Sequence, residues 1–283
     1  MANFTAADIK ALRERTGAGL LDVKKALDEA DGDTDKALEI IRVKGLKGVA
    51  KREGRSTSEG LVALTVQQST DVEGEVGTLV ELNSETDFVA KSDPFLNLSA
   101  RVLDATVAAG AADVDQALSA DADGKSVQEV IDSTAATLGE KVQLRRVARV
   151  AGERVASYLH HTAAGLPPAI GVLVATNVAG AAVAKDIAQH IAALSPQYLS
   201  REDVPEDVVA SERRIVEETA RNEGGNKPDH IIAKIAENRL NKFFEDVVLL
   251  EQPLAKSPEK KVGQLLSEIG GEITEFVRFR VGA

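Results

Sequence analysis

The side chains that could carry catalytic chemistry are scattered along this sequence. The histidines lie at positions His160, His161, His190 and His230. This spacing is unlike that of a metal site, and neighbouring residues on a strand face opposite ways. Gly124-Lys125-Ser126 resembles the end of a phosphate-binding loop, but that motif requires a glycine where this chain has Ser119. Because the carboxylates also lack a spacing typical of a general acid and base, we expect no enzyme, no cofactor and no metal.

Composition narrows the class of protein further. The chain has 283 residues, with 34 Lys plus Arg against 45 Asp plus Glu, and this net charge of −11 disfavours a nucleic-acid surface. Cysteine is absent, which excludes disulfides and cysteine-ligated metals and suits a reducing compartment. A hydrophobic content of 43 % is typical of a globular protein, and the length allows about two domains. These features predict an interaction protein.

Two stretches of the sequence bear on membrane targeting, and neither has the pattern of a targeting or membrane-spanning segment. Asp8 and Glu14 lie where a transit peptide would avoid acids, and no apolar signal region precedes them. The uncharged stretch 162–184 is interrupted by Pro167 and Pro168, so we interpret it as a loop, a buried strand and a helix start. We therefore expect a cytoplasmic protein with no membrane partner.

The periodicity predicts an α+β chain. Apolar residues recur at helical spacing over the first 50 residues and predict three short helices, joined by a glycine turn that presents Leu20 and Leu21. Two adjacent leucines cannot both point inward easily, so at least one is a candidate contact residue. The strands are predicted at 61–66, 77–83, 142–150, 155–159, 170–175 and 274–281, and the later helices at 95–107, 126–138, 183–194 and 262–269.

These elements predict five parts of the chain. We expect a helical module over 1–51, a linker over 52–60, a first core half over 61–140, a second core half over 141–202 and 246–283, and an antiparallel helical hairpin over 203–245. The hairpin could pack onto its own domain or project and pair with another protein. A homodimer through the hairpin is therefore one alternative.

An internal repeat is the most informative feature. An offset of 94 residues places the segment 77–91 on 171–185, with seven of fifteen positions identical. The shared strand, asparagine and helix start predict two related β-β-α units. Where the second copy has Gly180-Ala181-Ala182, the first has Thr86-Asp87-Phe88. Since the second copy manages with alanines, the carboxylate and the aromatic ring of the first copy are functional candidates.

The segment 42–55 offers a competing function. It contains six basic residues and one acid, and most runs of this kind are solvated helix ends. An adaptor that binds the ribosome or RNA through this segment is the alternative, although no aromatic side chains are interleaved with the basic ones.

Several motifs together resemble the bacterial elongation factor Ts family. They are Leu12-Arg-Glu-Arg-Thr-Gly-Ala-Gly-Leu20, Thr86-Asp-Phe-Val-Ala-Lys91, Ser157-Tyr-Leu-His160 and Val262-Gly-Gln-Leu-Leu266. The resemblance covers essentially the whole chain in order. It implies a ubiquitin-associated-like N-terminal module, a core of two related halves and a helical hairpin inserted in the second half.

The resemblance also implies a function. Members of the family bind elongation factor Tu carrying GDP and promote GDP release, so that GTP can rebind, without covalent chemistry. By analogy, the segment Thr86, Asp87, Phe88 and Val89 would be inserted near the Mg²⁺ site of the GTPase. The further partner-binding residues implied are Lys10, Leu12, Arg13, Leu20, Leu21 and His160.

Two departures from the family pattern concern the contact regions. The segment 161–168 is longer and richer in proline than the family's short glycine-containing turn, so the geometry next to His160 is expected to differ. The chain also stops at Ala283, whereas some members continue into a further helical module.

Overall fold

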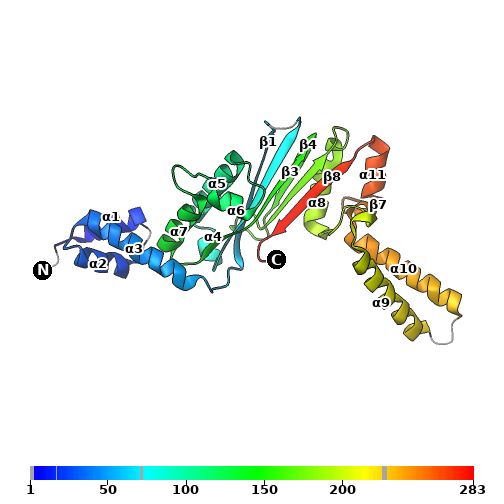
Figure 1. The fold of residues 1–283 in the computed structure, drawn as a ribbon, viewed down its shortest axis with the longest axis horizontal. Helices are drawn as coiled ribbons and strands as arrows, with labels where there is room; N and C mark the ends of the chain where they lie inside the picture. Colours follow the sequence, from blue (N-terminus) through cyan, green and yellow to red (C-terminus); the bar gives the residue numbers. More distant parts are fainter. Residues whose placement is uncertain (1–2, 17, 71–72, 225–227) are drawn as a thin grey trace.

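Two three-stranded antiparallel sheets form the centre of the molecule (Figure 1). The computed structural model describes residues 3–16, 18–70, 73–224 and 228–283. The first sheet has the order β1-β2-β3 and consists of β1 (Glu59–Gln68), β2 (Glu75–Ser84) and β3 (Val142–Gly152). The second has the order β4-β5-β8 and consists of β4 (Arg154–His160), β5 (Ile170–Thr176) and β8 (Ile273–Arg280). Both copies of the repeat thus contribute the middle strand of a sheet, as two related units predict.

The two sheets pack face to face through small and large residues that interlock. A Cβ on Gly77 of β2 would lie 2.8 Å from Leu173 Cδ2, and a Cβ on Gly171 of β5 would lie 2.7 Å from Leu79 Cδ1. Gly77 and Leu79 are the repeat equivalents of Gly171 and Leu173, so each copy offers a glycine to the leucine of the other. Both leucines are completely buried. The repeat therefore packs against itself across the centre of the protein.

Arg146, which forms an ion pair with Glu81 within the first sheet, makes a second connection between the sheets. Glu81 of β2 is fully buried and accepts a hydrogen bond of 2.5 Å from Nε of Arg146 on β3. The same arginine stacks 4.6 Å from the ring centre of Phe279 on β8 and donates to the carbonyl of Arg280 at 2.7 Å. Because an unpaired buried carboxylate is costly, Glu81 keeps Arg146 in place, and Arg146 in turn holds β8 beside the first sheet through Phe279 and Arg280.

Helices cover the outer face of each sheet, as Figure 1 shows. The first sheet is covered by α4 (Asp87–Ala90), α5 (Asp93–Ala108), α6 (Val114–Ser119) and α7 (Val127–Leu138). The second is covered by α8 (Ala181–Leu194) and α11 (Val262–Ile269), beside a small ribbon of β6 (Pro253–Leu254) and β7 (Ser257–Lys261). The mixture of helices and antiparallel sheets confirms the predicted α+β class. The sequence patterns did not predict α4, α6, β6 or β7, because each is too short to show a period.

The N-terminal helices are α1 (Ala6–Thr16), α2 (Leu20–Glu29) and α3 (Thr34–Arg52). They surround a small apolar core of their own. Gly17 of the predicted glycine turn lies outside the described residues, whereas Gly19 is the N-cap of α2. The third helix continues beyond this module onto the core, where a Cβ on Gly45 would lie 2.6 Å from the Cβ of Ala136 on α7.

The linker predicted over 52–60 is too long at both ends. Arg52 is still helical and Glu59 already belongs to β1, so the connection spans only 53–58. The physical reason is packing, since α3 is extended by its contact with α7 and β1 gains backbone partners on β2 up to the pair Glu59–Ser84.

The helical hairpin consists of α9 (Glu206–Gly224) and α10 (Asp229–Val247), and Figure 1 shows it projecting from the second sheet. Its helices pack through residues such as Val216, Leu240 and Phe244. The break predicted over 224–228 includes residues 225–227, which lie outside the described residues. Self-association through the hairpin stays a prediction. Among the described residues, no helix has both the length and the apolar character needed to cross a membrane.

His190 is a buried titratable group in the second half of the core. Its Nε2 lies 2.8 Å from Oε1 of Gln252, and its Nδ1 accepts from the backbone N–H of Ala255 at 3.0 Å. Both contacts are satisfied by the neutral ring that carries its proton on Nε2. Burial lowers the pKa of His190 below its ordinary value, because the charged form loses its hydration.

Replacement of Gly171 by alanine should destabilise the protein. The added methyl group would overlap Leu79, which has no space to move between two sheets, so we expect a loss of about 1–3 kcal/mol in the free energy of unfolding. Urea denaturation measures this change. Gly54→Ala is the control, since a Cβ there meets no atom within 4 Å. Equal stability of the two variants would contradict the interlocked packing.

The stability of the protein should fall as the pH decreases below about 6.5, the ordinary pKa of histidine. In that range the unfolded chain takes up a proton that folded His190 resists, at up to about 1.4 kcal/mol per pH unit. Urea denaturation between pH 5 and 7.5 measures the slope for wild type and for His190→Gln. The variant should show a shallower slope, because it lacks the buried ring whose protonation the folded protein resists. Identical slopes would exclude His190 as the cause.

Candidate interaction site at the turn after β2

The turn that follows β2 presents an exposed aromatic ring. Thr86 is the N-cap of α4, and its side-chain oxygen accepts from the backbone N–H of Val89 at 3.4 Å. Val89 is half-buried against the core between the first sheet and its helices. These two contacts fix the single turn of helix, and Asp87 and Phe88 between them point outward. Phe88 is 73 % exposed, which is the highest exposed fraction among the large apolar side chains that the structure describes.

The short length of α4 distinguishes the first copy of the repeat from the second. In the second copy α8 continues through Ala188, whereas the first copy has Pro94 at the equivalent position. Proline has no N–H to continue the helix, and a new helix, α5, begins at Asp93 with Ser92 as its N-cap. The helix in the first copy is thereby divided, and Phe88 lies on a separate turn that is not covered by other elements.

Lys91 accompanies the exposed pair. Its Nζ lies 3.4 Å from Oδ2 of Asp87 and 4.5 Å from the ring centre of Phe88. Both interactions are at the surface, where an ion pair contributes at most about 1 kcal/mol. The lysine therefore orders the two side chains without covering the ring, and a partner could bury Phe88 at little cost.

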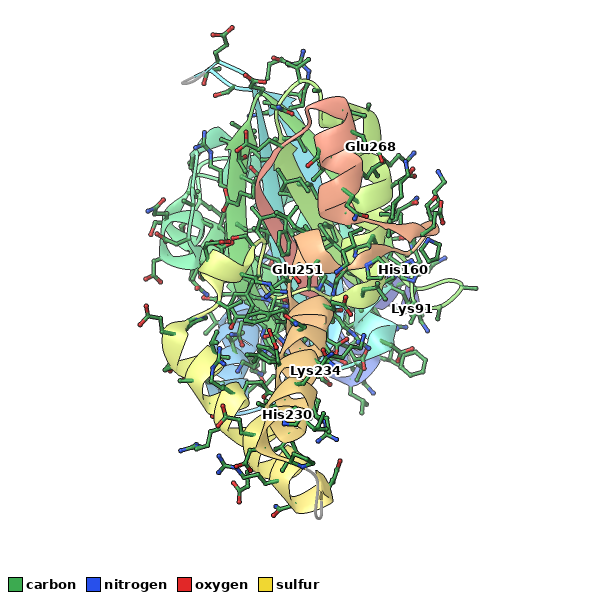
Figure 2. All side chains as sticks on the ribbon, turned by 90° about the vertical axis from the view of Figure 1, so that its right-hand side faces the viewer. Lys91, His160, His230, Lys234, Glu251 and Glu268 are labelled. Carbon is green, nitrogen blue, oxygen red and sulfur yellow. The ribbon has the colours of Figure 1, made fainter. Side chains whose placement is uncertain are left out.

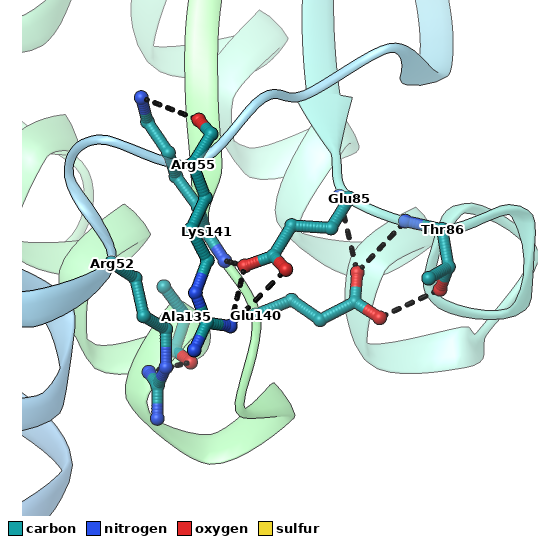
Figure 3. Close-up of polar contacts among 7 residues, drawn as sticks. All are labelled: Arg52, Arg55, Glu85, Thr86, Ala135, Glu140 and Lys141. Atoms are coloured by element: carbon teal, nitrogen blue, oxygen red, sulfur yellow. Dashed lines mark hydrogen bonds and ion pairs between the residues drawn. The ribbon is translucent and has the colours of Figure 1, made fainter.

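A polar network on the inner side of the turn holds its backbone (Figure 3). The Glu140 carboxylate accepts from the backbone N–H groups of Glu85 and Thr86 at 3.1 and 3.0 Å, and from the Thr86 hydroxyl at 2.6 Å. The Glu85 carboxylate in turn accepts from the backbone N–H of Lys141 at 2.6 Å and from Arg55 at 3.2 Å. These contacts extend the pairing of β2 and β3 beyond its last register pair, Ser84 with Val142.

The network reaches the segment that joins the N-terminal helices to β1. Nζ of Lys141 donates to the carbonyl oxygens of Glu53 and Arg55 at 2.6 and 3.2 Å, and Arg52 donates to the carbonyl of Ala135 at 3.4 Å. Sequence reasoning missed Glu140, Glu85 and Lys141. No local signal could have found them, because Glu140 lies 54 residues from Thr86 in the chain.

The N-terminal module exposes both of the predicted leucines. Leu20 is 53 % and Leu21 is 70 % exposed at the start of α2, and Lys10 and Arg13 are exposed on α1. The prediction that Leu12 belongs to the contact surface is corrected by the structure. Leu12 is only 2 % exposed, since the helical period of α1 directs it into the core of the three helices.

His160 ends β4 and its side chain is exposed. Its Nδ1 lies 3.1 Å from the hydroxyl of Tyr158, and the two rings are 6.1 Å apart between centres. The following segment folds back on itself, because Nδ1 of His161 donates to the carbonyl of Leu166 at 2.9 Å. Figure 2 shows His160 and Lys91 on the same side of the molecule.

The structure does not bring all predicted contact residues into one cluster. Figure 1 places α2 at one end of the molecule and α4 next to the first sheet. A partner that touches both must therefore be large. Within the described residues, no three His, Asp or Glu side chains are grouped so that they could hold a metal ion.

The basic segment 42–55 has partners within its own chain. Lys44 pairs with Glu29, Arg52 contacts the carbonyl of Ala135, and Arg55 pairs with Glu85. Neutralising these side chains would therefore disturb internal contacts. The contacts of these three described side chains are internal and give no support to the RNA-binding alternative.

Comparison with known proteins gives one consistent result. A family model described as Elongation factor TS matches residues 85–283, which is more than half of the chain. Three similar proteins, each named Elongation factor Ts, are aligned over 100 % of both chains. They come from Beutenbergia cavernae at 65 % identity, Kocuria rhizophila at 61 % and Renibacterium salmoninarum at 58 %.

Proposed function

This chain belongs to the elongation factor Ts family and is a translation elongation factor, and from that premise we propose that it binds elongation factor Tu carrying GDP and promotes release of the nucleotide. The observation that carries the proposal is the 73 % exposure of Phe88 on a one-turn helix beside Asp87. An aromatic ring in this position gains binding energy only when a partner buries it.

The proposed mechanism uses Phe88 as a wedge and Asp87 as a competing charge. Inserted near the Mg²⁺ site of the GTPase, the ring would displace the elements that hold the ion, and the carboxylate would disturb the same positive site. Without Mg²⁺ the phosphates of GDP lose their main counter-charge, and their affinity for the GTPase falls. Thr86 and Val89 serve the wedge indirectly in this proposal, as the cap and the anchor of its helix.

Exchange of this kind follows from differential affinity. The factor accelerates nucleotide release because it binds the nucleotide-free GTPase more tightly than the GDP-bound form. Thermodynamic linkage then requires GDP to weaken the binding of the factor by the same ratio. After GDP has left, GTP can rebind and displace the factor.

Two further regions supply affinity in the proposal. Leu20 and Leu21, with Lys10 and Arg13 nearby in the same module, form an apolar contact with a charged rim against the nucleotide-binding domain. His160 provides a second region against another domain of the partner. Its position on the same side of the molecule as Lys91 supports one continuous contact face (Figure 2).

The double substitution Asp87→Ala and Phe88→Ala should abolish most of the exchange activity. Loss of an interface anchor of about 2 kcal/mol corresponds to a decrease of roughly 30-fold in the rate of GDP release. Stopped-flow release of a fluorescent GDP analogue from the cognate elongation factor Tu measures this rate. Val178→Ala is the matched control, because Val178 is 60 % exposed at the corresponding turn of the second repeat. No acceleration by the wild-type protein would reject the proposed function.

Leu20→Ala should weaken association and leave the maximal rate of release unchanged. The side chain is too exposed to support the fold, so we expect the half-saturating concentration of the factor to increase about fivefold through lost contact area. A titration of the factor in the same assay separates the two parameters. Val43→Ala, which removes another exposed apolar group from the module, is the control. A lower maximal rate with unchanged half-saturation would place Leu20 in the wedge mechanism instead.

A further inference from the structure

The two copies of the repeat hold their strand-to-helix turns in different ways. In the second copy Asn177 caps its own turn, since its Oδ1 accepts from the backbone N–H of Gly180 at 2.8 Å and from that of Glu272 at 3.0 Å. The equivalent residue in the first copy, Asn83, is completely buried. Within the described part of the chain, neither its Oδ1 nor its Nδ2 has a hydrogen-bond partner. The first copy therefore lacks the local cap, although Asn83 has the same repeat position as the capping residue Asn177.

In the first copy, Glu140 accepts the hydrogen bond from the backbone N–H of the turn, although it lies outside the repeat. The backbone N–H of Thr86 occupies the position of that of Gly180, and it donates to Glu140 Oε2 at 3.0 Å instead of to Asn83. The same oxygen accepts from Glu85, and Oε1 accepts from the Thr86 hydroxyl. The direction of the turn is thus decided by a side chain on the segment between α7 and β3.

We propose that Glu140 is a positioning residue for nucleotide exchange, which holds the turn 85–88 in the orientation that presents Phe88 to the partner. This inference rests on the proposed function of the turn. Glu140 itself acts through the backbone of Glu85 and Thr86, so it need not touch the GTPase. Asn83 has the repeat position of Asn177, but its side chain makes no hydrogen bond to the N–H of Thr86, which donates to Glu140.

Hydrogen bonds also connect the turn that carries Phe88 to the end of the N-terminal module. Glu85 beside Glu140 binds Lys141 and Arg55, and Lys141 binds the carbonyl groups of residues 53 and 55 (Figure 3). The end of α3 and the wedge are thereby held by one group of hydrogen bonds. These hydrogen bonds consequently set where Phe88 lies relative to the helices of the N-terminal module.

Three variants of the full chain test the proposal. Glu140→Ala removes the acceptor. Glu140→Gln keeps it, because the amide oxygen can accept from both N–H groups while the amide nitrogen donates to the Thr86 hydroxyl. Glu153→Ala is the matched control, since Glu153 Oε2 accepts from the backbone N–H of Val178 at 2.8 Å in the turn of the second repeat, which carries no wedge.

Each variant is titrated in the GDP-release assay, and the amide hydrogen exchange of Glu85 and Thr86 is measured by NMR. For Glu140→Ala we expect a decrease of at least about tenfold in the maximal rate, a change of less than about threefold in half-saturation, and loss of protection at both amides. Glu140→Gln should restore both readouts, and Glu153→Ala should leave both as in wild type. If Glu140→Ala does not fold, Glu140→Asp, which withdraws the carboxylate by one methylene, takes its place with the same expectation.

Two results would overturn the proposal. One is a wild-type maximal rate in Glu140→Ala despite lost amide protection, which would show that the hydrogen bonds of Glu140 are irrelevant to exchange. The other is an equal loss of rate in the glutamine variant with protection retained, which would mean that the charge of Glu140 acts on the partner directly. Failure of the wild-type protein to accelerate GDP release would instead reject the proposed function, and the amide protection would still show whether Glu140 holds the turn.

Discussion

The structure depends on the face-to-face packing of its two sheets. Gly77 and Gly171 let each sheet approach the leucine of the other, and this contact buries the inner faces of both sheets. Helices then bury the outer faces, so the middle strands β2 and β5 are buried on both sides. Side chains within these packed layers are buried and have little freedom to reach a partner. Residues that are free to contact a partner are therefore confined to the turns at the strand ends and to the helical parts at the periphery.

The two copies of the repeat share their packing at the centre of the protein and differ at its surface. Both copies contribute the same strand and the same interlocking residues to the centre, and they differ where the chain leaves the sheet. In the first copy Pro94 divides the helix and frees one turn, whereas α8 of the second copy is continuous and lies on the core. Because the turn that carries Phe88 is not covered by other elements, its backbone needs hydrogen bonds from another part of the chain. That support comes from Glu140, on a segment that the sheet already holds beside the end of β2.

The extended shape of the molecule is consistent with the binding of a large partner at several points. The module of α1 to α3 lies at one end and the hairpin of α9 and α10 projects at the other (Figure 1). The long helix α3 is not a loose tether, because Gly45 allows it to lie directly on α7. Its end is then fastened by Lys141 and Arg55 to the same polar network that holds the turn of Phe88. Contact regions far apart in the chain are in this way given fixed relative positions.

The sequence by itself determined the class of fold, most strands and helices, the internal repeat and the choice of Phe88 as an unusual residue. Periodicity and turn residues are local signals, and a comparison of two repeat copies needs no coordinates. The same signals misjudged Leu12, whose burial depends on the face that α1 turns toward its neighbours, and the limits of the linker, which are set by α3 packing on α7. Only the tertiary structure decided that Glu140 caps the turn in place of Asn83. A hydrogen bond between residues 54 positions apart leaves no periodic trace, because it arises from the register of β2 on β3 and not from the spacing of residues along the chain.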